Sequence, residues 1–151
     1  IEEKKLIGKS LTMNLIENKT GELWADFMPQ RHAITNALSK DLISMQIYPV
    51  NYFTDFKPAN PFEKWAAIEV ADFESVPRDM ETFVLQSGLY AVFHYQGSST
   101  NNSIYQYIFG VWLPNSEYTL DNRPHFEILG EKYKNADPSS EEEIWIPIRQ
   151  K

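Results

Sequence analysis

The residues best suited to chemistry lie in a predicted strand at positions 125–129, where one acidic residue stands between bulky apolar neighbours. Alternation along a strand places His125, Glu127 and Leu129 on one face and the two residues between them on the other. A carboxylate among apolar side chains is costly to bury, and it becomes useful where a cation or a proton donor must be recognised. Glu127 is therefore the first candidate for a ligand-binding residue, with His125 on the same face. The alternative is that Glu127 simply faces water, as most glutamates do.

Two tryptophans on predicted strands are the next candidates. Trp65 shares a strand face with Glu69, opposite Ile68 and Val70, and Trp145 is flanked by isoleucines that point the other way. A core explains the isoleucine and valine side chains but not tryptophan on the alternate face. We therefore predict that both rings form walls of a groove, where an aromatic ring facing a cation contributes about 0.5–2 kcal/mol. The alternative is a second covered face, in which case both rings belong to a core.

Two further tryptophans and a tyrosine complete the aromatic candidates. Trp24 and Trp112 belong to apolar stripes of two predicted helices, so we expect them mainly in the core. Either ring would reach a ligand if the groove lies between the helices. Tyr48 lies on a predicted strand, where its hydroxyl is placed to hydrogen-bond a ligand.

The composition is that of one acidic globular domain covering residues 1–151, with 42% hydrophobic residues and a net charge of -7. This charge argues against a nucleic-acid partner, because phosphate binding needs clustered lysine and arginine. An acidic field instead concentrates cations, although the charge also has a simpler interpretation as a source of solubility.

Several classes of site are excluded by what the chain lacks. It contains no cysteine, which excludes disulfides and thiolate metal sites. His32, His94 and His125 lack metal-ligand spacing, so we expect neither a metal nor a cofactor. No apolar run approaches the ~20 residues of a membrane span, and we expect a cytoplasmic protein without a membrane partner.

Hydrophobic periodicity predicts the same order of elements, strand-helix-strand-strand, in both halves of the chain. The first helix begins with Thr20 as its N-cap and is interrupted by Pro29, after which an apolar stripe continues. Pro114 ends the second helix. The predicted strands cover residues 6–16, 44–50, 64–73, 80–95 (one strand or a kinked pair), 125–133 and 142–148, and the second helical stripe covers 104–113.

The predicted fold class is therefore α+β, a tandem duplication of a β-α-β-β unit with pseudo-repeats at about 4–74 and 80–149. Two such units combine their strands in one antiparallel sheet, with two helices packed on it and a groove between the halves.

The sequence resembles the GyrI-like effector-binding domain over nearly its whole length. The match rests on segments in the family's order, namely Leu23-Trp24, Gly88-Leu89-Tyr90-Ala91-Val92-Phe93, Gly97, Gly110-Val111-Trp112-Leu113-Pro114, Tyr118, Asp121, Pro124, Phe126-Glu127 and Ile144-Trp145-Ile146-Pro147-Ile148. In multidrug-responsive AraC- or MerR-type regulators, this domain follows a DNA-binding module, which is not present here. It binds lipophilic, often cationic, molecules in a groove with an acidic residue and aromatic rings.

The resemblance implies a bacterial small-molecule-binding protein related to transcription regulation or drug response, with Glu127 at the family's acidic position. Tyr90 matches a family tyrosine and is expected to hydrogen-bond the ligand or to donate a proton beside Glu127, unless it is a buried structural tyrosine. Some family members resemble hydrolases or a DNA gyrase inhibitor. A hydrolase using Glu127 and Tyr90, or an interaction with a protein partner such as gyrase, thus stays open, although binding without catalysis is the expectation. The oligomeric state does not follow from the sequence.

Overall fold

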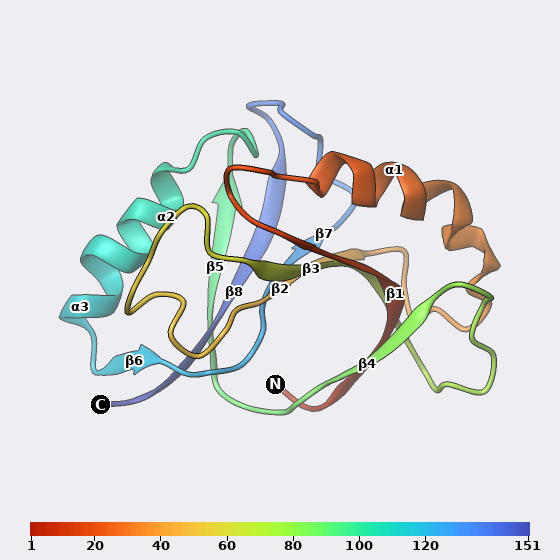
Figure 1. The fold of residues 1–151 in the computed structure, drawn as a ribbon, viewed down its shortest axis with the longest axis horizontal. Coiled ribbons are helices and arrows are strands. Elements are labelled where there is room, and N and C mark those ends of the chain that lie inside the picture. The colour runs from red at the N-terminus through yellow and green to blue at the C-terminus, as the bar shows by residue number, and fades with distance from the viewer.

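The computed structural model describes all residues from Ile1 to Lys151 as one curved antiparallel sheet with two helices (Figure 1). In the first half the elements are β1 (Lys4–Met13), α1 (Thr20–Gln30), the 3-10 turn η1 (Arg31–Ala33), β2 (Leu42–Ile47) and β3 (Phe62–Val70). In the second half they are β5 (Tyr90–Gln96), α2 (Ser103–Tyr107), η2 (Ile108–Trp112), α3 (Leu113–Asn115), β7 (His125–Leu129) and β8 (Glu141–Gln150). The strands β4 (Glu81–Leu85) and β6 (Tyr118–Leu120) are additional to the two units. No helix is long and apolar enough to cross a membrane.

The strand order confirms the predicted duplication. The main path of the sheet runs β4-β1-β3-β2-β7-β8-β5, so that the first unit contributes β1-β3-β2 and the second contributes β5-β8-β7 in mirror order. The two units join where β2 pairs antiparallel with β7, and Ser44 lies opposite Glu127 in that ladder. The sheet is therefore continuous across the junction, with Glu127 close to its centre.

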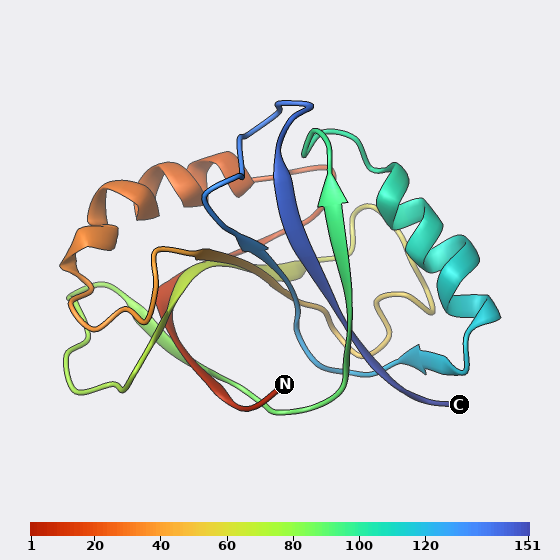
Figure 2. The ribbon, with the colours of Figure 1, turned by 180° about the vertical axis from the view of Figure 1, so that it is seen from behind.

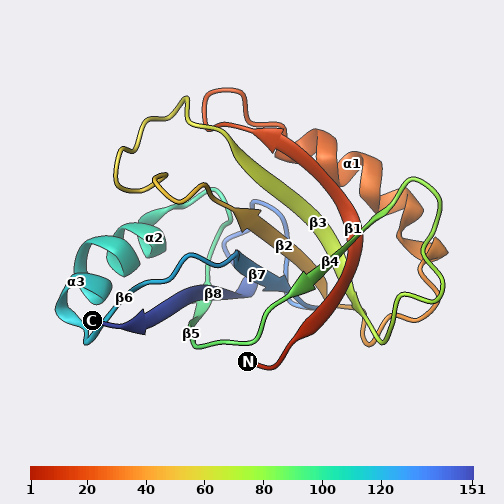
Figure 3. The same ribbon diagram turned by 60° about the horizontal axis from the view of Figure 1, so that its bottom comes forward.

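A short link between the two edge strands makes the sheet curl. β4 and β5 lie at opposite edges, yet only residues 86–89 connect them. Such a link spans at most about 18 Å, whereas the edges of a flat seven-stranded sheet would lie about 29 Å apart. The sheet must curve until its edges approach each other, as Figure 3 shows.

The concave face of this curl is a closed core. Trp65 is 3% exposed and Phe126 is fully buried there, and Trp145 stacks on Phe126 with ring centroids 5.2 Å apart. All seven strands of the main path contribute, from Leu85 on one edge to Tyr90 on the other. The second face of the sheet is therefore covered by the sheet itself.

The convex face carries the helices, one over each half (Figure 2). Helix α1 buries Leu23 and Phe27 against β1 and β3, and the helix at 103–115 packs on β5 and β8 around Ile108. The cross-strand row Ala66, Ser44, Glu127 and Ile144 on this face runs from one helix to the other. The two ends of the row are apolar and lie under the helices, whereas its two middle residues are polar and lie between them.

Several predicted element boundaries are wrong. Thr20 is the first residue of α1 and not its cap; the N-cap is Lys19, and the side chain of Asn18 accepts a hydrogen bond from the Thr20 backbone nitrogen instead (2.9 Å). The strands predicted to end at residues 16, 50, 73 and 133 end at Met13, Ile47, Val70 and Leu129, because turns and loops begin at these points. The region 80–95 is a pair of strands, and β6 was not predicted.

The helix ends also differ from the prediction. Pro29 lies inside α1 near its C-terminus, where the missing amide interrupts only the last turn, and the chain continues as η1. The apolar stripe predicted after it is not helical. Pro114 lies in the last turn of the second helix, which ends at Asn115 after the π-helical segment η2.

Gly8 marks the closest approach of two strands in the sheet. A β-carbon at this position would lie 2.1 Å from the backbone oxygen of Ala66 and 2.7 Å from the Cα of Ala67. Both obstructing atoms belong to the backbone of the central strand β3, so the neighbour has little freedom to move. Only glycine fits here without a shift of β1 against β3.

We predict that Gly8→Ala lowers the free energy of unfolding by about 1–3 kcal/mol, the usual penalty for an added methyl group in a packed interior. The measurement is urea denaturation followed by tryptophan fluorescence. Gly21→Ala in α1 is the matched control, because no heavy atom lies within 4 Å of its added β-carbon. Equal stability of the two variants would contradict the prediction.

Candidate ligand-binding site

A cavity of about 690 Å³ lies between the two helices above the centre of the sheet. Helix α1 contributes Trp24 and Met28, α2 contributes Tyr105, and the floor includes Ser44 and Glu127. The volume lies within the range of roughly 300–1,000 Å³ typical of small-molecule pockets. The cavity opens here because the curvature of the sheet holds the helices apart while each packs over its own half.

Glu127 presents an incompletely satisfied carboxylate at the floor of this cavity. The Tyr105 hydroxyl donates a hydrogen bond to its Oε1 at 2.9 Å, and Gln46 Nε2 lies 3.5 Å from the same oxygen. The other oxygen, Oε2, is buried and has no hydrogen-bond partner. A buried acceptor without a donor costs about 1–3 kcal/mol. A ligand that brings a donor or a positive charge would relieve this cost.

Two more ionisable side chains, Glu142 and Lys64, line the same cavity. Burial and the negative charge of Glu127 raise the pKa of Glu142 from 4.5 to about 7, against the opposing influence of Lys64. Burial lowers the pKa of Lys64, while Glu127 and Glu142 act in the opposite direction. Glu142 thus changes its charge near neutral pH, next to a carboxylate that repels a second negative charge.

Two tyrosines near Glu127 hold their protons, and Tyr105 donates its proton in a hydrogen bond to the carboxylate. Burial, followed by the charge of Glu127 and the hydrogen bond to it, strongly raises the pKa of Tyr105. Burial and the same charge also raise the pKa of Tyr48. Tyr95 and Tyr133 add further aromatic surface to the cavity. The site therefore combines a carboxylate, tyrosine hydroxyls and aromatic walls.

Comparison with known protein families assigns nearly the whole chain. Residues 2–148 match the family described as Cass2, integron-associated effector binding protein. The chain belongs to the Cass2 family. This match confirms the resemblance to effector-binding domains that the sequence showed. A comparison with curated proteins finds no match.

Several solved structures share this fold at low sequence identity. SAV2435 bound to tetraphenylphosphonium is 14% identical, with a TM-score of 0.67 over 99% of this chain and 90% of that chain. The integron cassette protein VCH_CASS2 from the mobile metagenome of Vibrio cholerae is 20% identical, with a TM-score of 0.62 over 99% and 92%. The EcmrR C-terminal domain is 14% identical, with a TM-score of 0.72 over 100% and 94%.

Among the residues singled out in the sequence, Glu127 and Trp24 line the cavity. His125 lies on the same sheet face as Glu127, and Tyr48 follows the end of β2 and is not on a strand as predicted; both line a neighbouring cleft of about 520 Å³. His125 stacks on Phe53 with ring centroids 5.6 Å apart, and burial lowers its pKa to about 4, so its imidazole is neutral at pH 7. Neither His125 nor Tyr48 lines the Glu127 cavity.

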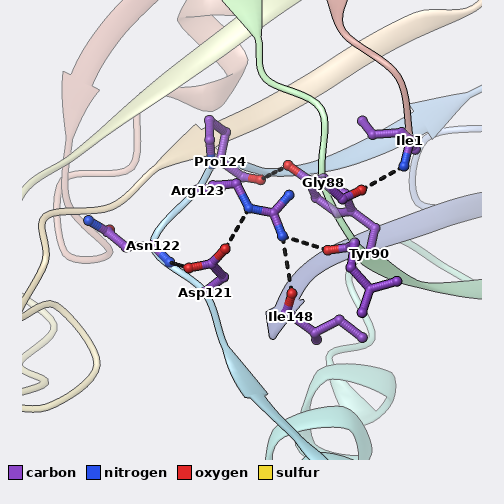
Figure 4. Close-up of polar contacts among 9 residues, drawn as sticks. Ile1, Gly88, Tyr90, Asp121, Asn122, Arg123, Pro124 and Ile148 are labelled. Carbon is purple, nitrogen blue, oxygen red and sulfur yellow. Dashed lines mark hydrogen bonds and ion pairs between the residues drawn. The ribbon is translucent and has the colours of Figure 1, made fainter. Parts of the chain in front are cut away.

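The prediction that Tyr90 stands beside Glu127 is wrong. Tyr90 lies on the concave face, where its hydroxyl donates to the Pro124 carbonyl oxygen at 2.8 Å and the Arg123 guanidinium lies 4.7 Å from the centre of its ring. Figure 4 shows this cluster, in which Arg123 also bonds to Asp121 and to the Ile148 carbonyl. Burial raises the pKa of Tyr90 to about 12, against the influence of Arg123. Tyr105 occupies the position next to Glu127 instead.

The three other tryptophans do not line the cavity. Trp65 and Trp145 belong to the concave core, where their indole nitrogens donate to Glu63 and Glu143. Trp65 and Trp145 are therefore not walls of a groove beside Glu127. Both rings lie in a core on the second face of the sheet, which was the alternative to the groove prediction. Trp112 packs edge-on against Phe93 in the core under the second helix.

Sequence reasoning missed Tyr105, Lys64 and Glu142 as cavity residues, although a signal was present. Glu142 alternates with Ile144 and Ile146, which face the helices, but it also stands in a run of three glutamates, a pattern typical of a solvated strand end. Lys64 alternates with Ala66 and Ile68 in the same way. In both strands, the polar residue at the end of an apolar alternation marks where the helix layer stops.

We predict that Glu142→Gln stabilises the fold above neutral pH by about 1–2 kcal/mol. In the folded protein the carboxyl keeps its proton up to about pH 7, whereas in the unfolded chain it ionises near 4.5. Wild-type stability therefore falls as the pH rises through this window, and the variant lacks this loss. Urea unfolding at pH 5 and pH 8 measures the effect. If Glu142→Gln changed the free energy of unfolding equally at pH 5 and pH 8, the raised pKa of Glu142 would be contradicted.

Proposed function

We propose that this chain captures a lipophilic cation in the cavity between α1 and α2, with Glu127 as the recognition charge. The observation that carries the proposal is the buried Oε2 atom of Glu127, which has no partner at the floor of a cavity with aromatic walls. A carboxylate held by one tyrosine hydroxyl remains an acceptor for a positive charge. The effector-binding family and the tetraphenylphosphonium-bound relative support the same ligand class.

The walls favour an apolar body around that charge. Trp24, Met28 and Tyr105 offer ring and thioether surface on the two helices, and Leu42 and Leu129 add aliphatic surface on the floor. Aromatic faces attract cations, and the attraction grows when water is excluded. A small, strongly hydrated cation gains little from such walls because it would lose its hydration shell. The expected ligand therefore spreads one positive charge over a bulky apolar framework.

We predict that the protein binds tetraphenylphosphonium and does not bind tetraphenylborate, which has the same shape and the opposite charge. Glu127→Gln should weaken binding of the cation roughly tenfold, because one close charge in a partly buried site is lost. Isothermal titration calorimetry measures both affinities. Glu117→Gln, which removes an exposed carboxylate outside the cavity, is the matched control and should bind like wild type.

Two results would contradict this proposal. Equal affinity for the phosphonium and the borate would show that shape alone governs binding. Unchanged phosphonium affinity in Glu127→Gln, with the fold intact by circular dichroism, would remove Glu127 from recognition.

The further expectations of a cytoplasmic location and a link to transcription regulation belong to the same proposal.

A hydrolase is the second candidate, because the Tyr105 hydroxyl lies 2.9 Å from Glu127 Oε1. In this scheme Glu127 takes a proton from water and Tyr105 donates one to the leaving group. If the site only binds ligands, cleavage of p-nitrophenyl acetate should not differ between wild type, Glu127→Gln and Tyr105→Phe. A rate above background that both substitutions abolish would establish the hydrolase instead. Absorbance at the nitrophenolate band gives the rate.

A further inference from the structure

Three charged side chains cross the floor of the Glu127 cavity in a diagonal. In the sheet register, Lys64 on β3 is the partner of Gln46 on β2, which in turn lies opposite His125. Glu127 lies two residues further along β7, and Glu142 is on the neighbouring strand β8. All three point to the convex face and line the one cavity. Glu127 thus lies between an ammonium group on one side and a carboxyl group on the other.

Lys64 is not engaged in any direct polar contact. It forms no hydrogen bond and no ion pair, although it is half-buried. Of the other half-buried lysines of the sheet, Lys4 pairs with Glu69 at 3.3 Å and Lys9 with Asp26 at 3.0 Å, whereas Lys5 has no partner and lies outside the cavity. The charge of Lys64 is therefore directed to the cavity, where Glu127 and Glu142 are the carboxylates that influence it.

The other residues that line the cavity carry no formal charge. Among them are Tyr95 on β5, Tyr105 on α2 and Tyr133 on the loop after β7. Trp24 and Met28 on α1 are uncharged. With both glutamates ionised and Lys64 protonated, the formal charge of the floor is -1.

We propose that Lys64 makes this cavity selective for singly charged cations over dications, because its ammonium group cancels one of the two carboxylates that a ligand meets. One monocation neutralises the floor completely. A dication of the same size would leave an excess positive charge in a partly buried space. Without Lys64 the floor would carry a charge of -2 and would suit a dication. This inference rests on the proposed function and specifies the ligand class within it.

The test compares N-methyl-4-phenylpyridinium with methyl viologen, two-ring cations of similar shape with one and two charges. Wild type should prefer the monocation at pH 8. Lys64→Met should tighten binding of the monocation about fivefold and of the dication about 25-fold, because Coulomb energy scales with the ligand charge. Calorimetry gives the four dissociation constants, and thermal melting confirms that the variant is folded.

Matched variants separate charge from shape. Lys40→Met removes an exposed lysine outside the cavity and should leave both affinities unchanged. Lys64→Arg keeps the positive charge and should therefore keep the preference for the monocation. If Lys64→Met does not fold, Lys64→Gln takes its place in the test. An unchanged ratio of the two affinities in Lys64→Met would overturn the inference while leaving the proposed function intact. If wild type bound neither probe nor tetraphenylphosphonium, the proposed function would fail and this inference with it.

Discussion

The four-residue link between β4 and β5 is the constraint on which the rest of the structure depends. It holds the two edges of a seven-stranded sheet together and thereby gives the sheet a concave and a convex face. The concave face closes on itself around Phe126 and needs no other layer. The convex face spreads its two helices apart, because each follows the curvature of its own half. The opening between them arises from the backbone path and not from a shortage of large side chains.

On the convex face, polar and apolar residues are divided between the uncovered strip and the parts of the sheet that lie under the helices. Along the row that crosses the junction, Ala66 and Ile144 lie under helices, while Ser44 and Glu127 lie where no helix covers them. Each half thus completes its own core before the junction is reached, and the polar side chains are confined to the uncovered strip. Tyr105, at the inner side of the second helix, then supplies the hydroxyl that keeps one oxygen of Glu127 satisfied.

The sequence predicted the order of the elements, the duplicated sheet and the face on which Glu127 lies, because all three follow from local alternation and periodicity. It did not predict which face of the sheet is open. Trp65 and Trp145 were assigned to a groove since they oppose aliphatic residues, but alternation only divides residues between two faces. The covering of the concave face depends on the short link between the edge strands β4 and β5, whose effect on sheet curvature no local pattern encodes. Tyr105 was passed over for a related reason, because a helical stripe does not reveal where its inner edge leaves the core.

The separate packing of the two helices has a mechanical consequence for the cavity. Helix α1 is fixed to the first half through Leu23 and Phe27, and the second helix is fixed to the other half through Ile108. Within the sheet the halves join through the five residue pairs of the β2–β7 ladder. Bending this ladder would also shift the concave core, to which all seven strands of the main path contribute. The distance between the helices, and with it the width of guest that fits, is therefore fixed by the far side of the sheet.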